Sequence, residues 1–220
     1  GSEMCIRDRS NMYLKYCGFT RRQDIEAAIQ CDVSAIGFIT YPKSARYVNL
    51  ETLHRLSKQV PDDIDRVAVA VNASMQTLQN IVEQTNINTL QFHGDESVET
   101  LRTFKKRYPQ IQVFKALPAD DMLRSHMMLY RDAVDKFLID TPSQQFGGTG
   151  EVFDWSYLND LSEAKYLIAG GLNTQNVAQL LKTHTHIDGI DIASGIEIDK
   201  GIKDPIKMKQ MCAIVKGAIR

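Results

Sequence analysis

A thiol and a carboxylic acid close two short apolar runs of this sequence, and together they could serve as a base and an acid. Cys17 ends the first run and Asp140 ends the sixth. A thiol accepts a proton readily once its pKa falls toward neutrality, which cations such as Lys15 or Arg46 could promote. A lone cysteine is more often a small buried hydrophobe. Chemistry at Cys17 therefore depends on where the fold places it.

Two glycine-containing loops indicate a site for an anion. Gly170 and Gly171 stand directly before an amphipathic segment, and Ser194 and Gly195 follow a short apolar run. Glycine lets backbone N–H groups approach a phosphate closely, and the start of a helix adds a favourable dipole. The alternative is that these glycines only make tight turns, and the order of the surrounding elements bears on the choice.

From Met12 onward, short apolar runs alternate with amphipathic segments. The apolar runs are rich in branched residues and predict eight strands, at Tyr13–Cys17, Ala35–Thr40, Arg66–Val71, Thr89–His93, Gln112–Leu117, Lys136–Asp140, Tyr166–Ala169 and Gly189–Ile192. The amphipathic segments carry apolar residues three and four positions apart and predict helices at Gln23–Gln30, Glu51–Gln59, Met75–Glu83, Val98–Arg107, Met122–Arg131, Thr174–Lys182 and Pro205–Lys216. Asn173 suits the position before a helix, and Pro205 suits a first helical turn.

Eight βα units of similar length predict a single (β/α)8 TIM barrel, an α/β fold of about 200–250 residues. A doubly wound open sheet is the rival, but it would carry a Gly-rich fingerprint after its first strand, where this chain has CGFTRR. Chemistry in a barrel lies at the carboxyl ends of the strands, and the last two loops commonly bind phosphate. The strand-end residues that would share this rim are Cys17, His93, Asp140 and Asp191. The loop Thr141–Glu151 is long, polar and Gly-rich, which is typical of a lid.

Composition limits the classes of partner. The chain has 220 residues, is 43% hydrophobic, and sets 26 Lys and Arg against 27 Asp and Glu. It can fill a core and offers no polybasic surface for nucleic acid or a membrane. Its longest uncharged stretch, Tyr166–Leu181, falls short of the roughly 20 apolar residues of a membrane span.

Four cysteines without a CxxC pair predict reduced thiols in the cytoplasm and no metal site. Residues 1–11 are expected to be a leader outside the fold, and residues 12–220 the catalytic barrel.

Several distinctive segments follow one another in unbroken order between Met12 and the C-terminus: KYCG at 15–18, GFITYPKSARYV at 37–48, LQFHG at 90–94, LIDT and FGGTG within 138–150, FDW at 153–155, IAGGL at 168–172, and GIDIASGIE with GIKD within 189–204. Together they resemble the phosphoribosylanthranilate isomerase family of tryptophan biosynthesis. That family is a (β/α)8 barrel that performs an Amadori rearrangement without a cofactor. The resemblance implies a phosphorylated small-molecule substrate, N-(5-phosphoribosyl)anthranilate, and the product 1-(2-carboxyphenylamino)-1-deoxyribulose 5-phosphate.

The resemblance also implies a role for each strand-end residue. Cys17 would be the general base and Asp140 the general acid. Arg46 would lie near the anthranilate end of the substrate, His93 in the pocket wall, and Asp191 on the substrate side. The residues expected at the phosphate are Gly170, Gly171, Ser194 and Gly195.

The chain departs from the family pattern at two positions, neither of which removes the acid or the base, and two other function classes stay open beside the resemblance. Tyr16 stands where the family usually has a smaller aliphatic residue or Phe, and Ala193 stands where many members have Ser. One alternative is a related phosphosugar barrel, such as an indole-glycerol-phosphate synthase or a two-aspartate isomerase of the histidine pathway. Another is a non-catalytic phosphate-binding barrel. The cysteine on the first strand speaks against the first, and the presence of both acid and base speaks against the second. The sequence leaves a monomer and a homodimer equally open.

Overall fold

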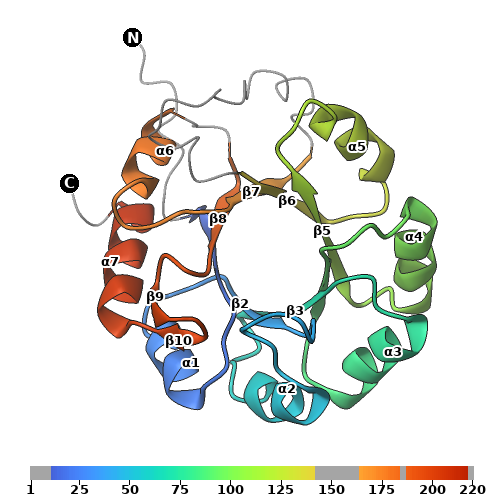
Figure 1. Cartoon of the computed structure of the whole chain (residues 1–220), viewed down its shortest axis with the longest axis horizontal. Coiled ribbons are helices and arrows are strands. Elements are labelled where there is room, and N and C mark those ends of the chain that lie inside the picture. The colour runs from blue at the N-terminus through green and yellow to red at the C-terminus, as the bar shows by residue number, and fades with distance from the viewer. Residues whose placement is uncertain (1–10, 142–163, 184–186, 218–220) are drawn as a thin grey trace.

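Eight parallel strands pair in chain order and close on themselves, so that β8 hydrogen-bonds to β1 (Figure 1). The computed structural model describes residues 11–141, 164–183 and 187–217. The strands are β1 (Tyr13–Cys17), β2 (Ala35–Ile39), β3 (Asp65–Ala70), β4 (Thr89–Phe92), β5 (Gln112–Pro118), β6 (Lys136–Asp140), β7 (Tyr166–Ala169) and β8 (Gly189–Ile192). The (β/α)8 barrel predicted from the spacing is confirmed, and the strand bounds agree with the predicted ones to within one residue.

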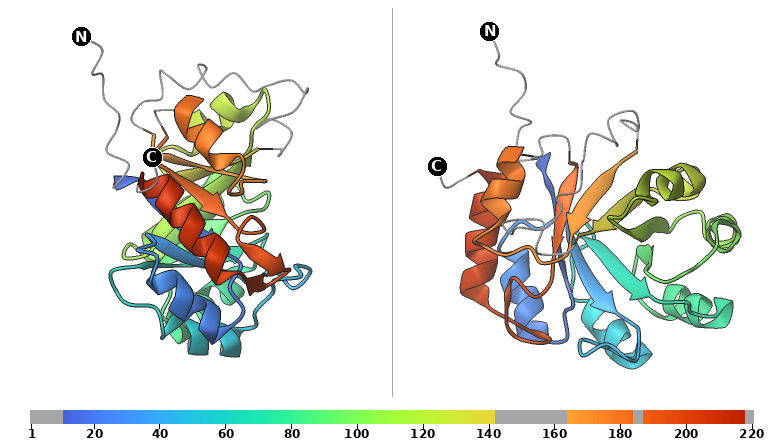
Figure 2. Two further views of the ribbon diagram at one scale, coloured as in Figure 1. Left: turned by 90° about the vertical axis from the view of Figure 1, so that its left-hand side faces the viewer. Right: turned by 45° about the horizontal axis from the view of Figure 1, so that its top comes forward.

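Helices surround the barrel on its outside (Figure 1). They are α1 (Arg22–Ile29), α2 (Leu50–Ser57), α3 (Met75–Gln84), α4 (Val98–Arg107), α5 (Leu123–Tyr130), α6 (Val177–Thr183) and α7 (Pro205–Lys216). The last of them, α7, packs between α1 and α6, so the first and the last helices of the barrel are neighbours (Figure 2). In the described residues, no helix has the length and apolar character needed to cross a membrane.

Polar side chains begin several of these helices. Asn49, Ser74 and Ser97 each accept a hydrogen bond from the backbone N–H three residues on, which satisfies a donor left free by the helix start. Asp204 does the same for α7, and Pro205 occupies its first turn as predicted.

The structure differs from the sequence expectation in two places near the C-terminal end. The helix predicted from Thr174 begins at Val177, because the Asn173 side chain caps a turn by accepting from the N–H groups of Gln175 and Asn176 at 2.9 Å each. The segment before α7, for which the sequence pattern predicted no strand, is an antiparallel hairpin of β9 (Glu197–Asp199) and β10 (Ile202–Lys203).

Two predicted segments fall outside the described residues. The leader of residues 1–11 is described only at its last residue, and the loop Thr141–Glu151 only at its first. The division of the chain at residue 12 and the lid over the rim therefore stay predictions.

Alternating side chains give the strands two apolar faces. The larger cluster joins strand residues such as Tyr16 and Phe38 to helix residues such as Leu53, so it lies between the barrel and the helices. The smaller cluster consists of strand residues alone and fills the barrel interior: Cys17, Ala35, Val67, Val69, Phe114, Ala116, Leu138 and Leu167. The thiol of Cys17 therefore belongs to the inner face.

The amino ends of the strands are closed by a polar plug centred on Asp65. Its carboxylate accepts from the Tyr13 hydroxyl at 2.6 Å, from Asn88 Nδ2 at 2.9 Å and from Gln112 Nε2 at 3.0 Å. The Lys136 ammonium lies 4.0 Å from the centre of the Tyr13 ring, within cation–π range. These residues stand at or next to the first positions of their strands, at the end of the barrel opposite Cys17 and Asp140.

We predict that Asp65→Ala destabilises the fold, because it removes an acceptor that three donors share. The free energy of unfolding should fall by about 2–4 kcal/mol, because the donors are left unpaired in a partly buried plug. Chemical denaturation measures this loss. Asp63→Ala, at an exposed turn residue, should change stability by less than about 0.5 kcal/mol. Equal losses in the two variants would contradict the central role of Asp65.

Candidate active site

Cys17 is the last residue of β1, and its side chain is buried inside the barrel. Its partner in the strand register is Gly37 of β2. A Cβ at position 37 would lie 2.6 Å from Cys17 Sγ, closer than any real contact. Glycine at this position thus leaves the space that the thiol occupies.

Lys15 and Asp191 form an ion pair beneath the thiol. The two residues are register partners on β1 and β8, and Lys15 Nζ lies 2.9 Å from Asp191 Oδ1. The Lys15 side chain is completely buried, whereas that of Asp191 is 13% exposed. Burial opposes the charged form of Lys15, but the Asp191 carboxylate and Cys17 outweigh it and raise the pKa of Lys15. The charged form of Lys15 beside Cys17 is therefore favoured.

The pKa of Cys17 lies above the usual value for a thiol. Burial is the largest cause, and the Asp191 carboxylate adds to it, while Lys15 and Lys203 act in the opposite direction. The depression that the sequence suggested does not occur in the free protein, because lost hydration of the thiolate outweighs the neighbouring cations.

Asp140 ends β6, and His93 directly follows β4. The Asp140 carboxyl packs against Gly170, where a Cβ would lie 2.5 Å from Oδ1. Solvent reaches both side chains, yet the walls around them displace enough water to shift both pKa values. Burial raises the pKa of Asp140, although His93 lowers it, and burial lowers the pKa of His93, although Asp140 raises it. The carboxyl is thereby biased toward its protonated form and the imidazole toward its neutral form.

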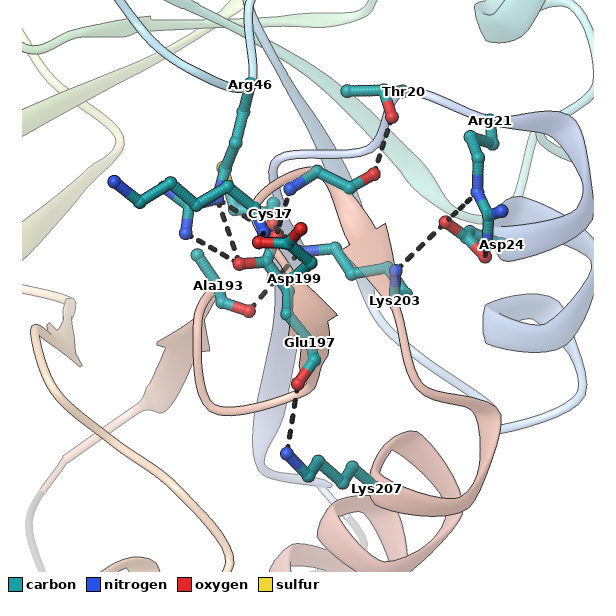
Figure 3. Close-up of polar contacts among 12 residues, drawn as sticks. Cys17, Thr20, Arg21, Asp24, Arg46, Ala193, Glu197, Asp199, Lys203 and Lys207 are labelled. Carbon is teal, nitrogen blue, oxygen red and sulfur yellow. Dashed lines mark hydrogen bonds and ion pairs between the residues drawn. The ribbon is translucent and has the colours of Figure 1, made fainter.

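Arg46 lies between β2 and α2 and is held by Glu197 of β9 (Figure 3). Its Nε lies 2.9 and 3.1 Å from the two carboxylate oxygens, and its Nη2 lies 2.6 Å from Oε1. This side-on arrangement uses one edge of the guanidinium. In the described part of the chain, Nη1 of Arg46 has no hydrogen-bond acceptor.

The loops after β7 and β8 touch each other. Gly170 and Gly171 have φ values of +93° and +67°, a backbone region that favours glycine. Asn173 forms an isolated β-bridge with Gly195, where a Cβ would collide with the carbonyl oxygen of Leu172. The expected anion-binding glycines therefore belong to two loops that are joined by backbone contact.

Sequence reasoning missed part of this arrangement. Glu197 and Lys203 lie within the quoted segments GIDIASGIE and GIKD, and the sequence pattern did not bring them together. Lys203 is fully buried beneath the rim and is hydrogen-bonded to protein oxygens. A signal was present, since GIE and GIKD place an acid and a base six residues apart. No three His, Cys, Asp or Glu side chains gather as metal ligands within the described ranges.

The fold and the site define a (β/α)8-barrel enzyme whose titratable side chains meet at the carboxyl ends of its strands. A model of the N-(5'-phosphoribosyl)anthranilate (PRA) isomerase family matches residues 14–213. The chain belongs to this family.

Individual relatives agree with the family match. An N-(5'-phosphoribosyl)anthranilate isomerase of Staphylococcus carnosus is 47% identical over 94% of this chain and 98% of its own length. A solved phosphoribosyl anthranilate isomerase of Thermotoga maritima is 30% identical with a TM-score of 0.81, covering 94% of this chain and 99% of its own. Another, bound to reduced 1-(o-carboxyphenylamino)-1-deoxyribulose 5-phosphate, is 28% identical with a TM-score of 0.79 and covers the same shares.

Proposed function

We propose that this enzyme converts N-(5-phosphoribosyl)anthranilate into 1-(2-carboxyphenylamino)-1-deoxyribulose 5-phosphate, a step of tryptophan biosynthesis, with Asp140 as general acid and Cys17 as general base. One observation carries the proposal: in a chain of this family, a carboxyl and a thiol end two strands at the same rim of the barrel. Neither the synthase alternative nor the non-catalytic barrel is favoured by any relative described above.

The first proton transfer opens the sugar ring. Protonated Asp140 donates to the furanose oxygen, the C1–O bond breaks, and the anthranilate nitrogen forms a Schiff base with C1. The raised pKa of Asp140 supports this role, because a general acid must hold its proton near neutral pH.

The second transfer moves the double bond. The Cys17 thiolate removes the proton from C2, the electron pair neutralises the iminium, and the resulting enolamine tautomerises to the ketose. A carboxyl begins roughly five pKa units below a thiol, and both groups are raised here. The productive state, with thiolate and carboxylic acid together, is therefore a minor form with one proton shared between two sites.

Binding fixes the two ends of the substrate. The backbone of Gly170, Gly171, Ser194 and Gly195 would bind the phosphate, and Nη1 of Arg46 would donate to the anthranilate carboxylate, with His93 and Asp191 lining the space between. The joined loops after β7 and β8 support the first assignment, and the side-on grip of Glu197 on Arg46 supports the second. For the whole protein we propose a monomer or homodimer in the cytoplasm, with neither nucleic acid nor membrane as partner, supported by its near-neutral charge.

We predict that Cys17→Ala folds normally and loses most of its turnover. The loss in kcat should be about 10²–10⁴, the usual contribution of a positioned base. The decay of anthranilate fluorescence on enzymatically made substrate measures the rate. Cys31→Ala serves as the control and should keep its turnover. Cys31 is also buried, but it follows α1 rather than ending a strand at the rim. A kcat near that of wild type in Cys17→Ala would remove the thiol from the mechanism.

We predict a bell-shaped pH dependence of kcat/KM in the wild type, with its alkaline limb at the pKa of Cys17. Above that pH the thiol is fully ionised, and the protonated fraction of Asp140 goes on falling. Asp140→Asn cannot ionise, so it should lose about 10²–10⁴ in kcat and also lose the alkaline limb. It should still bind the reduced product analogue. An alkaline limb that persists in Asp140→Asn would assign the acid to another residue.

We predict that inorganic phosphate raises the thermal stability of the protein by binding at the joined loops. Gly171→Asp should abolish the shift, because a carboxylate would occupy the position of the anion. Gly217→Asp is the matched control: Gly217 also has positive φ, 75°, but ends α7. That control should lose stability and keep the phosphate-dependent shift. A shift that survives in Gly171→Asp would place the anion elsewhere.

A further inference from the structure

Lys203 is buried under the rim with its ammonium matched by three protein oxygens. Nζ donates to the carbonyl oxygen of Cys17 at 2.5 Å, to that of Ala193 at 3.3 Å and to Glu197 Oε2 at 3.1 Å (Figure 3). A lysine ammonium has three donors, so all of them are used by the protein. Lys203 therefore acts on the protein rather than on a ligand.

Two of these acceptors belong to residues where the loops after β1 and β8 begin. The Cys17 carbonyl ends β1 beside the thiol, and the Ala193 carbonyl follows β8 directly before Ser194. The chain after Cys17 turns sharply through Gly18, whose φ is +88° and where a Cβ would collide with Arg46 Cδ at 2.6 Å. Lys203 thus ties the base-bearing strand to the loop expected at the phosphate.

Glu197 connects Lys203 to Arg46. Its Oε2 accepts from Lys203, from Arg46 Nε at 2.9 Å and from the backbone N–H of Gly201 at 3.1 Å, while Oε1 accepts from Arg46. Burial raises the pKa of Glu197, but the bonds from Arg46 and the charge of Lys203 outweigh it, and its pKa is lowered. One carboxylate therefore sets both the position of a buried ammonium and the plane of a guanidinium.

The fold holds this cluster from the other side as well. The backbone N–H of Lys203 donates to Asp24 Oδ2 at 3.0 Å, and Asp24 is itself paired with Arg21. The ring of Phe19 lies 5.2 Å from Nζ. Asp24 of α1 thus holds the backbone of Lys203, and Phe19, in the segment before α1, contacts its ammonium.

We propose that Lys203 and Glu197 are positioning residues for the isomerase reaction: Lys203 holds the strand end that carries the Cys17 thiol, and Glu197 holds Arg46 in the plane that receives the substrate carboxylate. The inference rests on the proposed function. It adds that a β9–β10 hairpin couples the base to the binding of the anthranilate end.

The charges around the thiol predict a specific pH signature. The charged groups that face Cys17 are Lys15 from β1, Asp191 from β8, Arg46 from the loop after β2, and Lys203 from β10. Removing Lys203 leaves the first three in place and takes away one cation. The thiolate should then form about one pH unit higher.

The test compares Lys203→Met and Glu197→Gln with Lys115→Met. Lys115 is also buried, is paired with Glu96 at 3.0 Å and donates to the Gly94 carbonyl at 2.6 Å, so it controls for the loss of a buried ion pair. For Lys203→Met we expect the alkaline limb of kcat/KM to move up by about one pH unit and the plateau to fall about tenfold. Lys115→Met should lose stability without moving that limb.

Glu197→Gln tests the second half of the proposal, that Glu197 positions Arg46. Released from its carboxylate, Arg46 should bind the reduced product analogue about tenfold more weakly, and KM should rise more than kcat falls. If Lys203→Met does not fold, Lys203→Gln, which keeps a donor without the charge, tests the same limb. An unmoved alkaline limb in the folded Lys203 variant, or wild-type affinity in Glu197→Gln, would overturn the proposal.

A second readout is independent of turnover. Thiolate absorbance, taken as wild type minus Cys17→Ala, reports the ionisation of Cys17 directly and should show the same upward shift in Lys203→Met. Full activity in Cys17→Ala would remove Cys17 as the base of the proposed function, while this titration would still decide whether Lys203 acts on the thiol.

Discussion

Desolvation at the carboxyl end of the barrel is the constraint on which the rest of the site depends. Charges taken out of water there must be matched by protein groups or shift their pKa. Lys15 meets this demand through Asp191, whereas burial still lowers the pKa of Lys203, although Glu197 and two carbonyls pair with it. Cys17 has no full partner, so its pKa rises. This imbalance favours the protonated form of the Cys17 thiol.

The two ends of the barrel solve the same problem in different ways. At the amino end, the Asp65 plug pairs donors and acceptors from neighbouring strands and leaves nothing reactive. At the carboxyl end, the pKa of Asp140 is raised and that of His93 lowered, because the walls exclude water without supplying a full set of partners. Cys17, Asp140 and His93, whose pKa values are all shifted by burial, lie at the end where polar matching is incomplete.

Sequence patterns predicted the barrel and its strand ends because both depend on local periodicity. Spacing of apolar runs located the strands, and the ends of those strands located Cys17 and Asp140. The β9–β10 hairpin was not predicted, since a three-residue strand paired with a two-residue strand gives too short a pattern. Nor was the Lys203–Glu197 pair, because its meaning comes from carbonyls of residues far away in the chain. The direction of the Cys17 pKa was also missed, since burial cannot be weighed against charge without coordinates.

The pairing of β1 with β8 has a consequence for the order in which the protein is made. Cys17 leaves the ribosome early, but Lys15 waits for Asp191, which follows 176 residues later, and the Cys17 carbonyl waits for Lys203. Until β8 is synthesised, β1 is an unpaired sheet edge that carries a buried-type lysine without its counter-ion. A nascent chain that stops short of the last βα unit therefore has an open sheet edge and lacks the Lys15–Asp191 and Lys203–Cys17 contacts. Closure of the barrel and completion of the polar surroundings of Cys17 both depend on the last part of the chain to be made.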